Sequence, residues 1–150
     1  MLSAHKEMNV QTYPHLKLAT RGTQGKTNGY LVPIYNEHES PIQSAQKPCQ
    51  VYLTVVAPGA IKGPHLHMQR WGLFTCIKGN IKIIVKTPQG YEDYYSGEDH
   101  EYKTIQVPAG WAAALHNQGS TESFVLNMPS PAWTPENQDD HQVSFADYKF

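Results

Sequence analysis

Two histidines separated by one residue, His65 and His67, are the side chains of this sequence best suited to chemistry. On a β-strand, residues i and i+2 point to the same side, so both imidazoles would face one space while Leu66 faces the opposite layer. Imidazoles that face the inside of a small β-barrel are costly to bury without water, a ligand or hydrogen-bond partners. Because imidazole titrates near neutral pH, the pair is suited to moving protons. Two interior histidines that only make hydrogen bonds remain the alternative.

The elements that must position this pair have the pattern of short β-strands. Eleven glycines and eleven prolines divide the chain into short segments, and helical periodicity is hard to find between them. Segments rich in β-branched and aromatic residues predict eight strands, over 29–34, 51–57, 73–77, 81–86, 91–95, 104–107, 111–115 and 123–126. Short strands at this spacing, with no room for crossover helices, predict an all-β sandwich or barrel.

The length of 150 residues predicts a single domain over 1–150. We expect an N-terminal arm over 1–28, a barrel over 29–128 and a C-terminal tail over 129–150. The first twenty residues and the tail show no strand pattern and are expected to be irregular. The tail ends in an aromatic cluster, Phe145, Tyr148 and Phe150, suited to packing on the barrel or on a partner subunit. Because small barrels often cover an open sheet edge with a second copy, we expect a homodimer.

Charge and composition exclude several classes of partner. Twelve Lys and Arg residues against thirteen Asp and Glu residues leave no field of one sign that would recruit nucleic acid or anionic lipid. No apolar run is long enough to cross a membrane, and the N-terminus lacks the pattern of a secretory signal. A cytoplasmic protein is therefore expected, with Cys49 and Cys76 as buried, reduced thiols.

The histidine pair also lies in a stretch that resembles the first motif of the cupins, in which Gly59 precedes His65 and His67 and Gly79 ends the next strand. The segment 108–110 (Pro-Ala-Gly), followed by Asn117, resembles the second motif. The resemblance implies an all-β fold, a single cupin (jelly-roll) β-barrel with irregular N- and C-terminal segments.

The same resemblance argues against a metal centre. In metal-binding cupins, a Glu follows the second His, and the second motif supplies a third His. Here the Glu position falls on Trp71 or Gly72 and the third His position on Ala113. Two ligands are too few for a stable site. His116 lies at an odd offset from Ala113 and should point to the opposite face. No metal and no cofactor are therefore expected, and a metal-dependent cupin remains a minor alternative.

Among cupins that work without metal, the chain resembles the RmlC-like enzymes that act on nucleotide-linked keto-deoxysugars. Segments resembling 3,5-epimerase motifs are 62–65 (Lys-Gly-Pro-His) with Gln69, 107–110 (Val-Pro-Ala-Gly), 133–135 (Trp-Thr-Pro) and 145–147 (Phe-Ala-Asp). Segments resembling 3,4-ketoisomerase motifs are 50–52 (Gln-Val-Tyr) and 62–67 (Lys-Gly-Pro-His-Leu-His). The chain departs from the epimerases at three positions, where their Lys, His and catalytic Tyr align with Gly72, Ala113 and Asn127.

The resemblance implies a role for each candidate catalytic residue. His65 would be the base, and His67 a second proton carrier or a hydrogen bond to the developing oxyanion. Tyr52 would supply the acid if it points inward, and Asp147 would be the carboxylate that pairs with the histidine. Ordinary strand packing is the alternative for Tyr52.

The substrate-binding side chains that the resemblance implies are Lys62, Gln69, Arg70, Trp71, Trp111 and Asn127. Lys62, Gln69 and Arg70, which lie near the histidines, would bind a diphosphate. The two tryptophans would stack on the base or sugar. A solvent-exposed Arg70 and tryptophans in the core are the alternatives. The expected function is a metal-independent epimerase of a nucleotide-linked 4-keto-6-deoxy sugar. A 3,4-ketoisomerase of the same substrate class and a non-catalytic sugar-binding cupin remain alternatives.

Overall fold

The structure is a computed structural model and describes residues 8–42 and 46–150. Every regular element in the described part of the chain is a β-strand, so the prediction of an all-β fold is confirmed. The strands are β1 (Gln11–Pro14), β2 (Leu18–Arg21), β3 (Thr27–Leu31), β4 (Tyr52–Val56), β5 (Ile61–Leu66), β6 (Gly72–Lys78), β7 (Asn80–Thr87), β8 (Gly90–Gly97), β9 (Lys103–Val107), β10 (Ala112–His116), β11 (Ser123–Asn127) and β12 (His141–Gln142).

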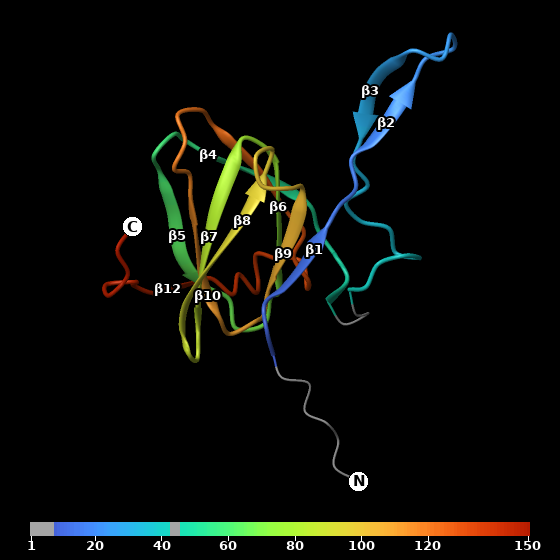
Figure 1. The fold of residues 1–150 in the computed structure, drawn as a ribbon. Coiled ribbons are helices and arrows are strands. Elements are labelled where there is room, and N and C mark those ends of the chain that lie inside the picture. Colours follow the sequence, from blue (N-terminus) through green and yellow to red (C-terminus); the bar gives the residue numbers. More distant parts are fainter. Residues whose placement is uncertain (1–7, 43–45) are drawn as a thin grey trace.

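Two five-stranded antiparallel sheets form the jelly roll (Figure 1). One sheet has the order β1-β9-β6-β11-β4, and we call it the A sheet; the other has the order β12-β5-β10-β7-β8, and we call it the C sheet. The hairpin β7–β8 is in continuous register from Asn80↔Gly97 to Thr87↔Gly90. In the C sheet, the strand β5, which carries His65, pairs with β10 on one side and with the short C-terminal strand β12 on the other.

The N-terminal segment is more regular than expected. β1 extends the A sheet by pairing with β9, and β2 and β3 form a hairpin that projects away from the barrel (Figure 1). The prediction that the first twenty residues are irregular is therefore wrong for 11–14 and 18–20. The strand predicted over 29–34 pairs with β2, not with a strand of either large sheet. Edge strands are held by backbone hydrogen bonds and need no apolar alternation, so the sequence pattern misses them.

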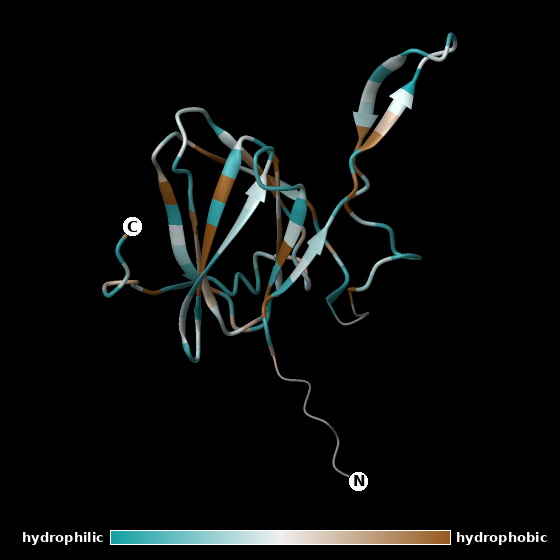
Figure 2. Ribbon diagram, viewed as in Figure 1, coloured by the Kyte–Doolittle hydropathy of each residue, from teal (hydrophilic) through white to brown (hydrophobic). Residues whose placement is uncertain are grey.

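The inner core lies between the sheets, around Val56, Ile83, Val85, Ile105 and Val125, each fully buried. Inward and outward side chains alternate along the strands, which gives the bands of hydropathy in Figure 2. The C-terminal tail covers the outer face of the C sheet, where Phe145 packs on Ile84, Ala112 and Ala114. The tail also contributes β12, which pairs with β5, so its expected irregularity is wrong at 141–142.

The two cysteines differ from one another. Both are free thiols, but only Cys76 is buried, while Cys49 is exposed on a connecting segment outside the strands. The expectation that both are buried is therefore wrong for Cys49, which lies before β4 and outside the sheets. Burial raises the pKa of the Cys76 thiol to about 11. In the part of the chain that the structure describes, no helix is long and apolar enough to cross a membrane.

Candidate active site

A cavity of about 330 Å³ opens between the two sheets at one end of the barrel. This volume is in the range of small-molecule sites. Seven of the residues expected from the sequence to form the site line it: Tyr52, Lys62, His65, His67, Arg70, Trp111 and Asn127. The rest of the wall is largely apolar or aromatic and includes Phe74, Val107, Leu115 and Trp133. The structure thus brings together polar groups from the strands β4, β5 and β11, and from the segments after β5 and before β12, in one partly apolar space.

A β-bulge in β5 puts Lys62 and His65 on the same wall of this cavity. Lys62 pairs with Leu115 and His65 with Ala113, so three steps along β5 oppose two steps along β10. The extra residue reverses the strict alternation, which would otherwise send Lys62 and His65 to opposite faces. Gly63 lies in the bulge at a φ of 91°, and an added Cβ there would meet the Ala113 carbonyl oxygen at 3.0 Å. Only glycine fits this position without a shift of the backbone.

His65 forms a histidine–carboxylate pair with Asp140. The Nδ1 atom of His65 lies 3.3 Å from Oδ1 of Asp140, and both side chains are about half exposed, at 48% and 50%. A proton on Nδ1 that faces the carboxylate leaves the lone pair on Nε2. The carboxylate also stabilises the imidazolium that forms when His65 takes a proton. The pair is therefore built to accept a proton in the cavity.

His67 is held as the neutral tautomer that carries its proton on Nδ1. Its Nδ1 lies 2.6 Å from the Asp139 carbonyl oxygen and 3.0 Å from Nη2 of Arg70. A carbonyl oxygen only accepts, so the short contact requires that Nδ1 donates, and the guanidinium of Arg70 then lies beside it as a nearby charge. Burial, together with that positive charge, lowers the pKa of His67, against the opposing effects of the Asp139 carbonyl and the carboxylates of Asp140 and Asp139. Within the described residues, Nε2 of His67 has no hydrogen-bond partner.

Arg70 is a buried cation without an ion pair. The residue is only 8% exposed, and none of the ion pairs found among the described residues includes it. A buried charge is costly unless a partner or ligand compensates it. Because Arg70 lines the cavity, an anionic ligand bound there would supply that partner.

Tyr52 lines the cavity, and its hydroxyl hydrogen has no acceptor among the residues that the structure describes. The amide of Asn127, opposite Tyr52 on β11, accepts the Leu73 N–H at 3.2 Å through Oδ1 and donates from Nδ2 to the Tyr52 hydroxyl oxygen at 2.6 Å. Because the tyrosine oxygen accepts this bond, its O–H remains available for a ligand. The Asn127 amide thus orients the Tyr52 hydroxyl.

Three residues expected in the site lie outside the cavity wall. Asp147, expected to pair with the histidine, accepts the Tyr91 hydroxyl on the outer face of the C sheet. Gln69 accepts a hydrogen bond from Asn137 at 2.8 Å, and Trp71 forms a backbone bridge with Ser130. The pairing expected of Asp147 is thus corrected to Asp140, seven residues earlier, because β12 brings 140 and not 147 to the open end of β5.

Asp140 and Trp133 line the cavity as well, although the sequence pattern did not predict them there. Both lie in a tail without apolar alternation, and a two-residue strand such as β12 leaves no periodic signal. The sequence held two signals for them: the Trp-Thr-Pro segment at 133–135, which resembles an epimerase motif, and the acidic Asp139-Asp140 pair that follows it.

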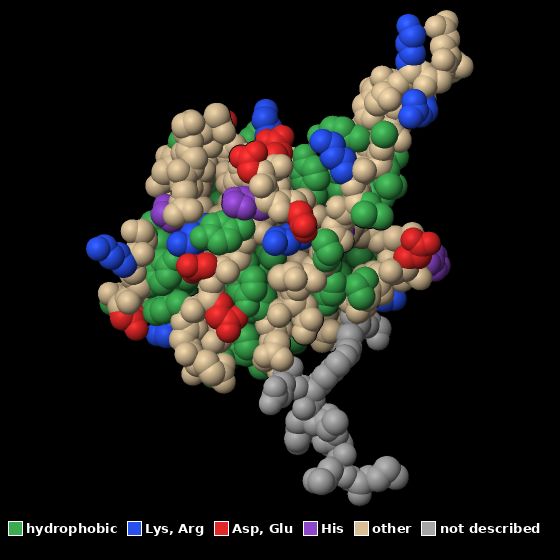
Figure 3. Space-filling model, viewed as in Figure 1, with side chains coloured by type: hydrophobic (Ala, Val, Ile, Leu, Met, Phe, Trp, Pro, Cys, Tyr) green, Lys and Arg blue, Asp and Glu red, His purple; other side chains and the backbone are tan. Residues whose placement is uncertain are grey.

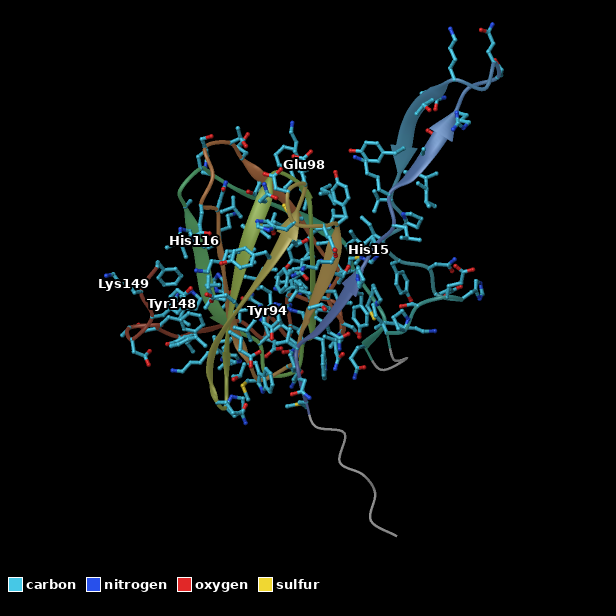
Figure 4. All side chains as sticks on the ribbon, in the orientation of Figure 1. His15, Tyr94, Glu98, His116, Tyr148 and Lys149 are labelled. Atoms are coloured by element: carbon cyan, nitrogen blue, oxygen red, sulfur yellow. The ribbon has the colours of Figure 1, made fainter. Side chains whose placement is uncertain are left out.

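The donor set of the cavity does not fit a metal centre. Among residues 8–42 and 46–150, no three His, Cys, Asp or Glu side chains are grouped so that they could hold a metal ion. Ala113 pairs directly with His65, at the position where metal-binding cupins would place a histidine. His116 lies on the outer face of the C sheet, where its ring packs on Phe150 near Tyr148 (Figure 4).

Comparison with solved structures identifies the fold. A dTDP sugar isomerase from Desulfovibrio desulfuricans G20 matches with a TM-score of 0.76 and 16% identity, over 91% of this chain and 85% of that one. The 3,4-ketoisomerase QdtA from Thermoanaerobacterium thermosaccharolyticum matches with a TM-score of 0.69 and 17% identity, over 91% and 90%. The RmlC epimerase of Mycobacterium tuberculosis matches with a TM-score of 0.70 and 17% identity, over 92% and 70%. The prediction of an RmlC-like cupin fold is confirmed.

Sequence comparison adds the family. No curated protein sequence matches the chain. The family model of the polysaccharide biosynthesis C-terminal domain matches residues 40–141, which include both large sheets except β1 and the last residue of β12, and every residue of the cavity wall. Because this match covers more than half of the chain, the protein belongs to the polysaccharide biosynthesis C-terminal domain family.

Proposed function

We propose that this protein is a metal-independent epimerase that acts on a nucleotide-linked 4-keto-6-deoxy sugar by moving a proton at the carbon next to the carbonyl. The observation that carries the proposal is the convergence of the His65–Asp140 pair and the free hydroxyl of Tyr52 in one cavity beside the buried, unpaired Arg70. The names of the similar solved structures, a sugar isomerase, a ketoisomerase and an epimerase, support the same class of reaction. The family, which belongs to polysaccharide biosynthesis, supports it as well.

The first step of the proposed reaction is proton abstraction by His65. The 4-keto group acidifies the neighbouring C–H bond, because the electrons of that bond can move into an enolate. Nε2 of His65 takes the proton, the C–H bond breaks, and the negative charge develops on the carbonyl oxygen. Asp140 stabilises the imidazolium that results. Lys62, on the same wall as His65, supplies a positive charge for the developing oxyanion.

The second step returns a proton to the opposite face of the sugar. Tyr52 enters the cavity from β4 in the A sheet, whereas His65 enters from β5 in the C sheet. A planar enolate between the two sheets would have one of these groups on each face. Tyr52 would donate its O–H to carbon, the configuration at that carbon would invert, and solvent would restore the two side chains to their starting protonation states.

The nucleotide diphosphate would bind at the cationic and aromatic part of the wall. Arg70 would pair with the diphosphate in two-pronged geometry, and this would compensate its burial. Trp111 and Trp133 both line the cavity and offer faces for stacking on the base or the sugar.

One observation favours a 3,4-ketoisomerase as a second candidate. Moving the carbonyl from C4 to C3 through an enediol requires a base for the C3 hydroxyl proton as well as one for the C–H proton. His67 offers a free Nε2 lone pair on a neutral ring, and its ring lies parallel to that of His65, with the ring centroids 6.4 Å apart. The second histidine is therefore suited to that additional transfer.

The experiment that tests the proposal is product analysis by NMR. Purified protein would be incubated with dTDP-, UDP- and GDP-linked 4-keto-6-deoxyhexoses at high enzyme concentration. An epimerase leaves the carbonyl at C4 and inverts a neighbouring centre, whereas a ketoisomerase moves the carbonyl to C3. Unchanged sugar in every case, with intact binding of the nucleotide, would contradict catalysis and leave a sugar-binding cupin.

We also propose that the protein is a homodimer formed through its β2–β3 hairpin. Leu18, Tyr30 and Leu31 on the β2–β3 hairpin are between 43% and 49% exposed, and an isolated two-stranded hairpin is marginal in water. Apolar side chains gather where the hairpin leaves the barrel (Figure 3). Light scattering should give twice the chain mass for the wild type and the chain mass for the double variant Leu18→Asp, Leu31→Asp. A wild type that is monomeric at micromolar concentration would refute the dimer.

A further inference from the structure

Asp139, which the proposed chemistry does not use, makes an unusual number of contacts next to His67. It lies just before β12, and its side chain is only 6% exposed. Its φ of 47° is in the left-handed region, which aspartate and asparagine tolerate better than most residues. Its neighbour Asp140 faces His65 in the cavity, so the two consecutive acids serve different parts of the structure.

The carboxylate of Asp139 holds the turn that follows His67. Oδ1 accepts the Met68 N–H at 2.9 Å, and Oδ2 accepts the N–H groups of Gln69 and Arg70 at 2.9 Å and 3.0 Å. Burial would raise the pKa of this carboxyl, but the three N–H bonds outweigh it and lower the pKa of Asp139. The group is therefore ionised at neutral pH and fixes three successive backbone groups.

The main chain of the same residue holds the imidazole. The carbonyl oxygen of Asp139 accepts the Nδ1–H of His67 at 2.6 Å. One residue thus grips the backbone directly after His67 with its side chain and the ring of His67 with its carbonyl. A bond to the ring alone would let the ring move together with the backbone of 68–70. Because Asp139 bonds both the ring and that backbone, the His67 ring keeps one position relative to the main chain.

We infer that Asp139 is the positioning residue for His67, which fixes the Nδ1–H tautomer and presents a free Nε2 lone pair to the cavity. A histidine without such a carbonyl acceptor exchanges between its two neutral tautomers. The other charged or titratable groups that face His67 are Arg70, Asp140 and, at a ring distance of 6.4 Å, His65. Of these, only Arg70 reaches Nδ1, at 3.0 Å, and its guanidinium could donate there only if Nδ1 carried no proton; the shorter contact of 2.6 Å with the Asp139 carbonyl, which only accepts, places the proton on Nδ1. The catalytic consequence of this inference rests on the proposed function, whereas the tautomer itself does not.

The direct test is ¹⁵N NMR of histidine-labelled full-length protein without substrate, with the His67 signals assigned by a His67→Gln variant. At pH 7.5, we expect the wild type to show a protonated Nδ1 and an unprotonated Nε2 at His67. In Asp139→Asn, the amide NH₂ replaces a carboxylate oxygen and cannot accept a hydrogen bond from the backbone N–H groups of 68–70. The turn should therefore loosen, and the tautomer of His67 with its proton on Nε2 should become populated. Asp147→Asn is the matched control, because it removes a tail carboxylate that bonds only Tyr91 among side chains, and it should leave the His67 signals unchanged.

The wild-type spectrum makes the inference falsifiable even if an Asp139 variant fails to fold. A wild-type His67 with its proton on Nε2 would overturn it. A folded Asp139→Asn or Asp139→Ala protein with wild-type His67 signals would overturn it equally.

Activity gives a second readout that separates this inference from the proposed function. With a sugar whose carbonyl moves to C3, the reaction in which His67 is a reacting group, Asp139→Asn should lower kcat on the order of 10- to 100-fold with little change in KM, because a small displacement of a reacting group costs up to about 100-fold. Asp139→Ala should cost more, since asparagine keeps one acceptor oxygen and tolerates the left-handed backbone. The expected tautomer in a protein without any turnover would refute the proposed function and leave the positioning role intact. Normal kcat in Asp139→Asn with a changed tautomer would refute the catalytic consequence.

Discussion

The two ends of the barrel interior are built from the same strands and differ in what those strands place inward. On β4, Val56 lies in the closed, apolar end, whereas Tyr52, four residues away on the same face, lies in the cavity. On β11, Val125 is in the core and Asn127 is in the cavity wall. Val56 and Val125, at the closed end, are fully buried and do not line the cavity. The comparison indicates that the closed end stabilises the fold and the open end carries the chemistry.

The loss of the proposed base should have the largest effect. We expect His65→Ala to lower kcat at least 100-fold and up to about 10⁴-fold, which is the usual worth of general base catalysis. Its thermal midpoint should stay within a few degrees of the wild type, because the side chain is half exposed. Steady-state kinetics and a melting curve on the same preparation would check both. Equal activity of His65→Ala and wild type would contradict the claim that the open end of the barrel carries the chemistry.

A void created in the core at the closed end should lower stability and leave activity unchanged. Ile83 is fully buried in the core, and Ile83→Ala should lower the free energy of unfolding by about 2–5 kcal/mol, as buried Ile-to-Ala changes do. Its kcat, measured well below the melting temperature, should match the wild type. Ile61→Ala is the matched control, since Ile61 is 39% exposed and should lose much less stability in denaturant titration. If kcat of Ile83→Ala fell as far as that of His65→Ala, the two ends would not be separable.

The buried cation should affect binding more than turnover. Arg70→Ala should weaken the binding of a nucleoside diphosphate about 10- to 100-fold, since a hydrogen-bonded charged group is worth about 1.5–3 kcal/mol. Arg70→Lys should recover only part of this, because lysine lacks the two-pronged donor geometry. Calorimetric titration with the nucleoside diphosphate would measure its dissociation constant for the wild type, Arg70→Ala and Arg70→Lys. Lys78→Ala, which removes an exposed cation outside the cavity, should bind normally.

The smallest expected effect is the pH dependence of stability. Burial lowers the pKa values of His15, His67 and His116 below their ordinary value of 6.5, with Arg70 and Lys82 adding to the effect at His67 and His116. The unfolded chain therefore binds more protons than the folded one as pH falls through 6.5. The histidine contribution to stability is complete above about pH 7 and is lost progressively as the pH falls below 6.5. The denaturant midpoint should fall between pH 7.5 and 5.5, and a midpoint that rises over this interval would contradict the assignment.

The sequence sufficed for the open end where residues lie on regular strands. The i, i+2 spacing predicted that His65 and His67 share a face, and the strands around Tyr52 and Asn127 were found from their β-branched and aromatic content. It did not suffice where the backbone departs from a regular period. The bulge at Gly63, which turns Lys62 toward His65, cannot be read from alternation. Asp140 reaches His65 through a two-residue strand, and only the tertiary structure selects it over Asp147.

The most direct test of the central claim is solvent deuterium incorporation into a nucleotide-linked 4-keto-6-deoxy sugar, followed by NMR for wild type, His65→Ala and Ile83→Ala. Proton abstraction at the open end predicts deuterium at a carbon next to the carbonyl with wild type and with folded Ile83→Ala, and at least 100-fold slower incorporation with His65→Ala. Incorporation by His65→Ala at the wild-type rate, or no incorporation by wild type with a sugar that it binds, would contradict the claim.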